Sequence, residues 1–193
     1  MMMHKQLFEG RTIRLAAIDP EKDGAVEAAW TYDLDYTREL RLGPARPLGA
    51  LELKKNYEAL GKKEDAGNQF HFAVRLMDED RLIGFVRFHS IFWIHGTAIF
   101  TLSFADADLL RQYGPEALEL IFCYGFCELN LYRLETILPS YRLEAIALFE
   151  GAGFLMEARR RQAAYRDGRL WDVLNYGILQ AEWKSREAEA LAL

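Results

Sequence analysis

The stretch from Thr97 to Leu138 constrains the fold most, because it joins two expected strands through a helix. Thr97–Phe104 has the composition of a strand, a polar segment follows it, and Pro115–Leu129 is apolar on nearly every side. Arg133–Leu138 then predicts a second strand. A helical crossover of this length returns the chain so that the two strands pair in parallel.

The junction between the polar segment and the helix is a candidate anion site. Pro115 suits the first helical position, where its missing amide is not needed, and Glu116 suits the positive end of the helix dipole. The unpaired amides of a helix start point at one spot and can hold a phosphate or pyrophosphate. Such sites follow the carboxyl end of a strand, which here is Phe104. A helix start that holds only water or a capping side chain is the competing interpretation.

Hydrophobic periodicity predicts the remaining elements. Alternation predicts strands over 12–17, 70–76, 82–88, 154–164 and 169–179, and a helical period predicts helices over 21–30, 48–60 and 143–152. This order indicates the α/β class: a mixed, mostly antiparallel twisted sheet with one parallel pair and helices on both faces. We expect a single domain over residues 1–193, with a charged C-terminal tail from about 184 to 193.

Composition narrows the possible partners. The net charge of −5 comes without the basic stripe of a nucleic-acid binder, and no apolar run is long enough to cross a membrane. Met1–Phe8 lacks the apolar core of a signal peptide, so we expect a cytoplasmic protein. Cys123 and Cys127 lie four residues apart on one expected helix, which indicates reduced thiols. The histidines have no ligand-like spacing, so no metal site is expected.

Three motifs give the chain a resemblance to a known family. Tyr113–Leu118 is similar to Tyr-Gly-Thr-Glu-Ala-Leu, Ala145–Glu150 is similar to Ala-Ile-x-Leu-Tyr-Glu, and Tyr165–Gly168 is followed by Asp172-Val173. With the element order, these motifs resemble the GNAT superfamily of acetyl-CoA-dependent N-acetyltransferases, and within it the RimJ/RimL-like enzymes. The resemblance covers nearly the whole chain. It implies acetyl-CoA as co-substrate and a primary amine as acceptor, either a protein N-terminus or a small amine.

The resemblance also implies where acetyl-CoA binds. The strand that ends at Phe104 is expected to hydrogen-bond the pantetheine arm, and the loop amides after it are expected to hold the pyrophosphate. The cofactor-binding residues that the family motifs place on this chain are Ser103, Phe104, Arg111, Gln112, Tyr113, Gly114, Glu116, Arg142 and Phe149.

Several of these positions depart from the family pattern. Leu109 and Gln112 replace a basic or amide residue and the first glycine of the loop motif, Arg142 replaces an asparagine, and Phe149 replaces a tyrosine. A glutamine that must adopt positive φ costs about 1–2 kcal/mol, which Arg111 could offset by pairing with a phosphate. The departures motivate an alternative function, a catalytically impaired GNAT-fold protein that serves as a CoA-binding or protein-interaction module.

Candidate catalytic residues lie around the strand 133–138. Ser140 and Tyr141 follow this strand and Glu135 lies within it, near the place where thiolate and amine would meet. Turn residues and a surface charge would explain the same pattern. An amine of pKa near 8 is the more tolerable acceptor, because more of it is neutral at pH 7 than of an alkyl amine near 10.4.

The acceptor is expected to enter beside a segment that mixes aromatic and acidic residues: Tyr32, Asp33, Asp35 and Tyr36. A solvated linker with aromatic anchors is the competing interpretation of this segment. The paired C-terminal strands leave a homodimer open. An unrelated nucleotide-binding fold is disfavoured because the sequence has neither a G-x-G-x-x-G nor a P-loop pattern.

Overall fold

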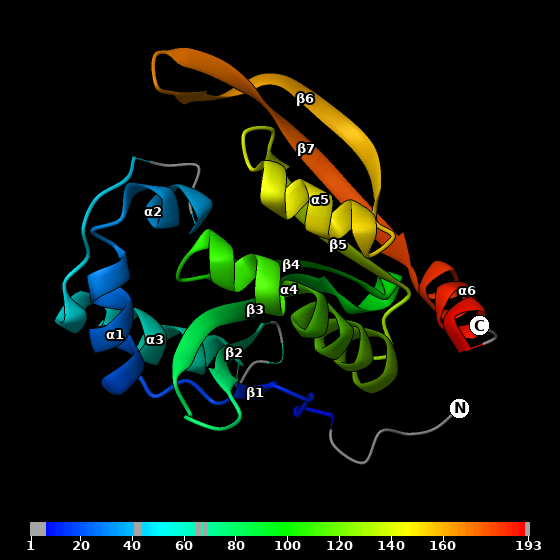
Figure 1. The fold of residues 1–193 in the computed structure, drawn as a ribbon, viewed down its shortest axis with the longest axis horizontal. Coiled ribbons are helices and arrows are strands. Elements are labelled where there is room, and N and C mark those ends of the chain that lie inside the picture. The colour runs from blue at the N-terminus through cyan, green and yellow to red at the C-terminus, as the bar shows by residue number, and fades with distance from the viewer. Residues whose placement is uncertain (1–6, 41–43, 65–66, 68, 192–193) are drawn as a thin grey trace.

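The computed structural model describes residues 7–40, 44–64, 67 and 69–191, and across them runs a seven-stranded sheet (Figure 1). The strand order is β1-β2-β3-β4-β5-β7-β6. The strands are β1 Ile13–Ala16, β2 Phe70–Leu76, β3 Leu82–Phe92, β4 Thr97–Phe104, β5 Arg133–Pro139, β6 Leu155–Arg166 and β7 Arg169–Leu179. The helices are α1 Lys22–Trp30, α2 Leu34–Leu40, α3 Ala50–Glu64, α4 Ala107–Phe122, α5 Leu143–Gly151 and α6 Gln180–Leu191. A 3-10 turn occupies Trp93–His95, and the π-helical segment Cys123–Glu128 continues α4.

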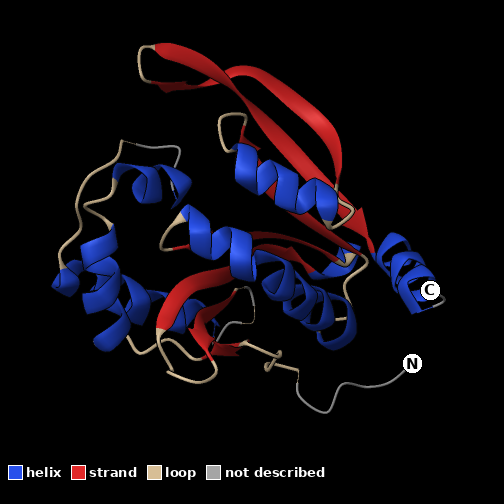
Figure 2. Cartoon of the chain, viewed as in Figure 1, coloured by secondary structure: helices blue, strands red, loops and turns tan. Residues whose placement is uncertain are grey.

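The predicted mixed sheet is confirmed. Every neighbouring pair of the described strands is antiparallel except β4 and β5, which run parallel because α4 carries the chain across between them. The β6–β7 hairpin extends beyond the rest of the molecule (Figure 2). Its turn is made by Asp167 and Gly168, both in the left-handed region with φ of 51° and 76°. The turn type that such residues favour is why this pair predicts a hairpin.

The parallel pair opens into a fork. β4 and β5 share ladder positions only from Thr97 opposite Arg133 to Ile99 opposite Glu135. Beyond that rung β4 continues to Phe104 and β5 to Pro139, and the two strands are no longer paired with each other. α4 begins just after the end of β4, and α5 begins just after the end of β5.

Helices cover both faces of the sheet, as predicted. On one face the main core joins β4 and β5 residues such as Phe100 and Leu134 to Leu118 of α4. On the other face a smaller cluster formed by Ala73, Leu82 and Phe85 contacts Trp30 of α1 and Tyr57 of α3. In Figure 1, α1, α2 and α3 gather at one end, while α4 and α5 run across the strands.

The predicted start of the central helix at Pro115 is wrong. α4 begins at Ala107, eight residues earlier, and Pro115 lies inside it. Asp106 is the N-cap, and its carboxylate accepts a hydrogen bond from the Leu109 amide at 2.8 Å. Aspartate is among the strongest N-cap residues, so this cap outweighs the proline as a start signal.

Two other segments are more helical than the sequence indicates. Residues 30–36, expected as a loop, contain the start of α2, where Asp33 accepts from the Asp35 amide at 2.7 Å. The expected charged tail is largely α6, and Trp183 of that helix is buried against Phe122 and Phe126. Cys123 and Cys127 are not joined in a disulfide, in agreement with the predicted reduced state.

Candidate functional site

Where β4 and β5 separate, β4 has a backbone edge that is not paired with β5. Alternate residues of a strand point to opposite faces, so Phe100, Leu102 and Phe104 enter the main core, while Thr101 and Ser103 face the α1–α3 side. The edge of β4 that faces β5 is released from the ladder after Ile99. A released strand edge hydrogen-bonds an extended amide chain in the way another strand would. The fork therefore leaves β4 unpaired from β5 beside Ser103 and Phe104, where the family resemblance predicts the pantetheine arm of acetyl-CoA.

The predicted pyrophosphate loop is not a loop. Arg111, Gln112, Tyr113 and Gly114 lie in the second and third turns of α4, so their amides belong to the helix interior. Arg111 pairs instead with Asp108 at 2.7 Å on the exposed surface. The carboxylates of Asp106 and Asp108 stand at the actual start of the helix. These residues do not form the expected cradle, and acidic groups occupy the helix end where a phosphate would be expected.

Two further predicted cofactor residues have structural contacts. A Cβ at Gly114 would lie 2.7 Å from Leu148 Cδ2, so the glycine allows α4 and α5 to approach each other. Glu116 accepts hydrogen bonds from the Thr12 hydroxyl and from the amides of Arg11 and Thr12. It therefore fastens α4 to the start of β1.

The remaining two cofactor candidates lie at α5. Phe149 is 2% exposed and packs edge-on against Phe154 with ring centroids 5.1 Å apart, inside the main core. Arg142 is the residue before α5, 9% exposed, and its amide donates to Pro139 O at 3.1 Å. Of the two, Arg142 lies at the carboxyl end of β5, beside the fork.

The three catalytic candidates all have protein partners. The Ser140 hydroxyl accepts from the Asp172 amide at 3.2 Å, and the Tyr141 hydroxyl donates to Arg38 O at 3.3 Å. Glu135 lies at the last rung of the fork and accepts from Arg133 Nε at 3.0 Å. Arg133 also pairs with Glu157, and these two carboxylates raise the pKa of its guanidinium. Glu135 therefore lies where the two strands separate, and its carboxylate is already paired with a cation.

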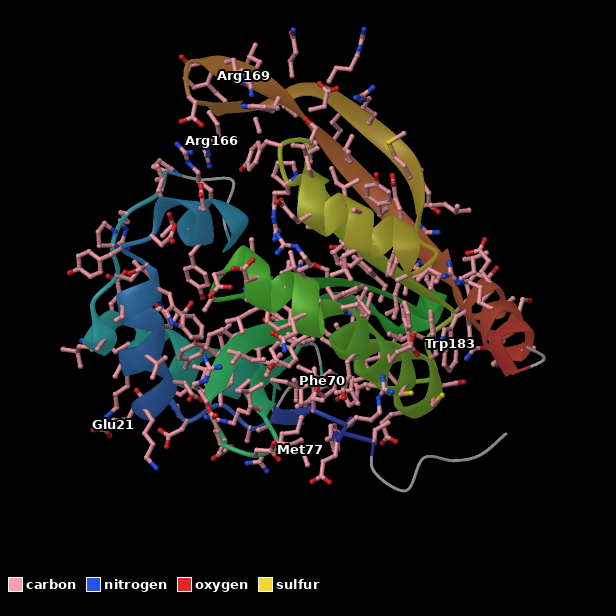
Figure 3. All side chains as sticks on the ribbon, viewed as in Figure 1. Glu21, Phe70, Met77, Arg166, Arg169 and Trp183 are labelled. Atoms are coloured by element: carbon pink, nitrogen blue, oxygen red, sulfur yellow. The ribbon has the colours of Figure 1, made fainter. Side chains whose placement is uncertain are left out.

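A bridge joins α2 to the projecting hairpin near Tyr141. Arg38 of α2 donates to both carboxylate oxygens of Asp167, at 3.0 and 2.5 Å. Tyr141 packs edge-on against Trp171 at 5.4 Å, and the Arg169 guanidinium lies 3.6 Å from the Trp171 ring centroid (Arg169 is labelled in Figure 3). Tyr141 is therefore held by two contacts, one of its ring with Trp171 and one of its hydroxyl with the backbone of Arg38.

The predicted acceptor segment divides into exposed and buried residues. Tyr32 is 78% exposed, Asp35 lies in the first turn of α2, and Asp33 caps that helix. Tyr36 is buried, and its hydroxyl donates to Glu27 Oε1 at 3.0 Å. Of these four residues, Tyr36 is the one hydrogen-bonded to Glu27, which lines a partly open space in the structure.

That space is a polar cavity of about 160 Å³ between α1, α3 and the sheet, which we call the Glu27 cavity. Its polar lining includes Glu27, Tyr57, His71, Arg87, Thr101 and Ser103. Glu27 is 5% exposed and accepts hydrogen bonds from the hydroxyls of Tyr36 and Tyr57. Burial, followed by the charge of Glu27, raises the pKa of Tyr57, so this hydroxyl stays protonated as a donor.

Glu27 is not among the residues singled out from the sequence, although its spacing from Asp23 on the expected helix is visible there. Asp23 and Glu27 are four residues apart on α1 and share one helix face, and both are buried. Asp23 is neutralised by Arg75 at 2.5 Å. Two acids on a buried helix face require partners, and two of the partners of Glu27 are the tyrosine hydroxyls of Tyr36 and Tyr57, from α2 and α3.

Within the described ranges, histidine, cysteine, aspartate and glutamate form no group able to hold a metal ion. The same ranges contain no helix with the length and apolarity to span a membrane.

Comparison with known proteins identifies the family. Residues 52–174 match the acetyltransferase (GNAT) domain family. YnaD of Bacillus subtilis strain 168, named an uncharacterized N-acetyltransferase, is 27% identical over 157 residues, which cover 80% of this chain and 89% of YnaD. The spermidine N(1)-acetyltransferase of Vibrio cholerae serotype O1 is 26% identical over 136 residues, covering 67% and 79% of the two chains.

The fold agrees with a solved structure. A spermidine N-acetyltransferase from Vibrio cholerae, in complex with CoA and spermine, superposes with a TM-score of 0.77 at 22% identity, over 89% of this chain and 98% of that one. The family match covers the forked strands, α4 and α5, on which the site is built. The chain belongs to the GNAT family of acetyl-CoA-dependent N-acetyltransferases.

Proposed function

We propose that this chain transfers the acetyl group of acetyl-CoA to a small primary amine held in the Glu27 cavity. The lining of that cavity carries the proposal. Thr101 and Ser103 of the forked strand form part of its wall, and Glu27 of α1 forms another part. An amine bound by Glu27 would therefore share one partly open cavity with the strand along which the pantetheine arm is expected to bind.

The residues of the cavity suit the binding of a cationic head group. Acetyl-CoA supplies the activated thioester, and the protein must hold the amine and allow it to lose a proton. Glu27 is a buried carboxylate oriented by Tyr36 and Tyr57, and a buried carboxylate is strongly stabilised by a cationic partner. Removing the proton from an alkyl ammonium group of pKa about 10.4 costs about 4.6 kcal/mol at pH 7. Turnover should therefore rise with pH, because more of the amine is then neutral.

Relatives support a small amine as acceptor. The similar sequence and the similar solved structure from Vibrio cholerae are both named as spermidine acetyltransferases, and the structure contains spermine. A protein N-terminus remains the second acceptor class, and the RimJ/RimL-like assignment rests on the sequence motifs alone. We also propose a cytoplasmic location, which the free thiols of Cys123 and Cys127 favour.

One observation favours the second candidate function, an impaired module. Asp106 caps α4 and Asp108 stands beside it, so the helix end is acidic where the family resemblance expects a pyrophosphate. Negative charge at a helix N-terminus stabilises the helix and competes with an anionic ligand for the same amides.

Calorimetric titration with acetyl-CoA, followed by addition of amines while free thiol is measured, tests both functions. Binding together with amine-dependent thiol release is the result expected for the transferase. Binding without release from any small amine or peptide N-terminus would overturn the transferase in favour of the module. Absence of binding would overturn both.

A further inference from the structure

A second, larger cavity lies at the edge of the sheet. It measures about 470 Å³, within the size range of small-molecule sites, and we call it the edge cavity. It exists because β1 ends at Ala16, opposite Ala73, so the first residues of β2 extend past their neighbour. Apolar side chains dominate its lining: Phe8, Leu15, Leu60, Phe70, Phe72 and Tyr124 (Phe70 is labelled in Figure 3).

The edge cavity adjoins the Glu27 cavity. Four residues line both spaces: Ile18, Tyr57, Leu60 and His71. Tyr57 is also the donor to Glu27, so the same side chain borders the apolar space and orients the carboxylate. The two cavities therefore meet where α3 covers β2, and the edge cavity continues around the edge of the sheet to Phe70 and Phe72, which pack against the main core.

The pair of cavities crosses the strands in sequence. The Glu27 cavity reaches from Thr101 on β4 through Arg87 on β3 to His71 on β2, and the edge cavity continues past β2. Neighbouring strands lie about 4.8 Å apart, so β4 and β2 are separated by roughly 10 Å. A molecule of that length could place one end at the fork and the other at the sheet edge.

We propose that the acceptor is a primary amine with an apolar tail, whose amine lies beside Glu27 and whose tail fills the edge cavity. This inference rests on the proposed function, because it extends the same acceptor site. It assigns the substrate class: alkyl or arylalkyl amines are preferred over amines that carry a second charge at the far end.

The lining of the edge cavity argues against a second ammonium group. Among the residues that line the edge cavity, Glu58 has the carboxylate that could pair with a cation, and this side chain is exposed. An ion pair at an exposed carboxylate contributes little, whereas moving an ammonium group among phenylalanine side chains is unfavourable. An apolar tail gains from the same surroundings, by about threefold to fourfold in affinity for each methylene that is buried.

A matched set of amines tests the inference through thiol release from acetyl-CoA. Hexylamine and 1,6-diaminohexane have the same length and differ in the distal ammonium. We expect kcat/KM for hexylamine to exceed that for the diamine by at least tenfold, and to rise about threefold per methylene from propylamine to hexylamine. Equal values for the pair, or no dependence on chain length, would overturn the inference and leave the proposed function standing.

A cavity-filling variant locates the effect. Gly61 of α3 lines the edge cavity, and a Cβ there would meet no atom within 4 Å. Gly61→Leu should lower kcat/KM for hexylamine at least fivefold and leave propylamine within twofold. Gly151→Leu on α5, where a Cβ likewise meets nothing, is the matched control and should change neither.

The outcomes separate the two proposals. Equal loss on both amines in Gly61→Leu, with an unchanged melting temperature, would overturn the placement of the tail. Thiol release from no amine by the unmodified protein would overturn the proposed function and this inference with it.

Discussion

Tyr57 on α3 donates its hydroxyl to the carboxylate of Glu27 on α1, and this contact ties two helices together above the sheet. The same residues line the cavity that reaches Thr101 and Ser103 of the forked strand β4. The proposed acceptor site therefore lies where helices distant in sequence meet the strand that separates from its parallel neighbour.

Removing the Tyr57 hydroxyl should weaken amine binding. A hydrogen bond to a charged group contributes about 1.5–3 kcal/mol, so Tyr57→Phe should raise KM for the amine about tenfold with a smaller change in kcat. Steady-state thiol release measures both constants. Tyr165→Phe, at a residue 63% exposed on β6, is the control and should match the unmodified protein. An unchanged KM would show that the Tyr57–Glu27 contact does not order the site.

Replacing the α4 cap by a neutral one should strengthen acetyl-CoA binding. Asparagine caps a helix about as well as aspartate, so Asp106→Asn should keep α4 while removing one negative charge. We expect about fivefold tighter binding by calorimetry at low salt, with the gain reduced at high salt because charge interactions are screened. Asp78→Asn, in the β2–β3 turn, is the control. If Asp106→Asn bound acetyl-CoA with the same affinity as the unmodified protein at both low and high salt, the result would contradict a pyrophosphate bound near the start of α4.

Restoring the family glycine should weaken the fold rather than repair a loop. Gln112 is an exposed residue inside α4, and glycine in a helix interior is about 1 kcal/mol less favourable than alanine. Gln112→Gly should lower the melting temperature, and Gln112→Ala should hold or raise it. If the glycine variant melted higher than the alanine variant, this segment would not be helical in solution.

Glu116 should make stability depend on pH. Burial raises its pKa, but hydrogen bonds from Thr12 and the amide of Arg11 outweigh burial and bring the pKa below its ordinary value of 4.5. The ionised carboxylate therefore stabilises the fold above the unfolded-state pKa, and this contribution is lost as pH falls through the lowered folded value.

Glu116→Gln should accordingly melt below the unmodified protein at pH 7, and the difference should shrink toward pH 3 in thermal unfolding curves. Glu128→Gln, at an exposed residue of the π-helical segment that continues α4, is the control. If the difference in melting temperature between Glu116→Gln and the unmodified protein did not change with pH, the effect would come from altered packing and hydrogen bonding and not from the charge of Glu116.

The sheet could be predicted from sequence because its signals are local. Alternation marks β2 and β3, and the α4 crossover requires β4 and β5 to be parallel. The start of α4 was predicted wrongly because Asp106 and Pro115 both signal a helix start, and only packing decides between them. Local sequence places Gly114 in a phosphate loop, whereas its contact with Leu148 is made by α5, 34 residues later in the chain.

The candidate site was less predictable because its central contacts are long-range. Glu27 meets Tyr36 and Tyr57, which lie 9 and 30 residues away in sequence. A single sequence shows an acidic residue on a helix but not which tyrosines come to it. The predicted segment 32–36 contains Tyr36, whose hydroxyl donates to Glu27 of the cavity wall.

The most direct test of the account is thiol release by Glu27→Gln beside Glu79→Gln, a control in the exposed β2–β3 turn. Calorimetry first establishes that both variants bind acetyl-CoA as the unmodified protein does. The account predicts that Glu27→Gln lowers kcat/KM for the best small amine at least tenfold, mainly through KM, and that Glu79→Gln changes nothing. Amine kinetics in Glu27→Gln equal to those of the unmodified protein would contradict an acceptor site at this cavity.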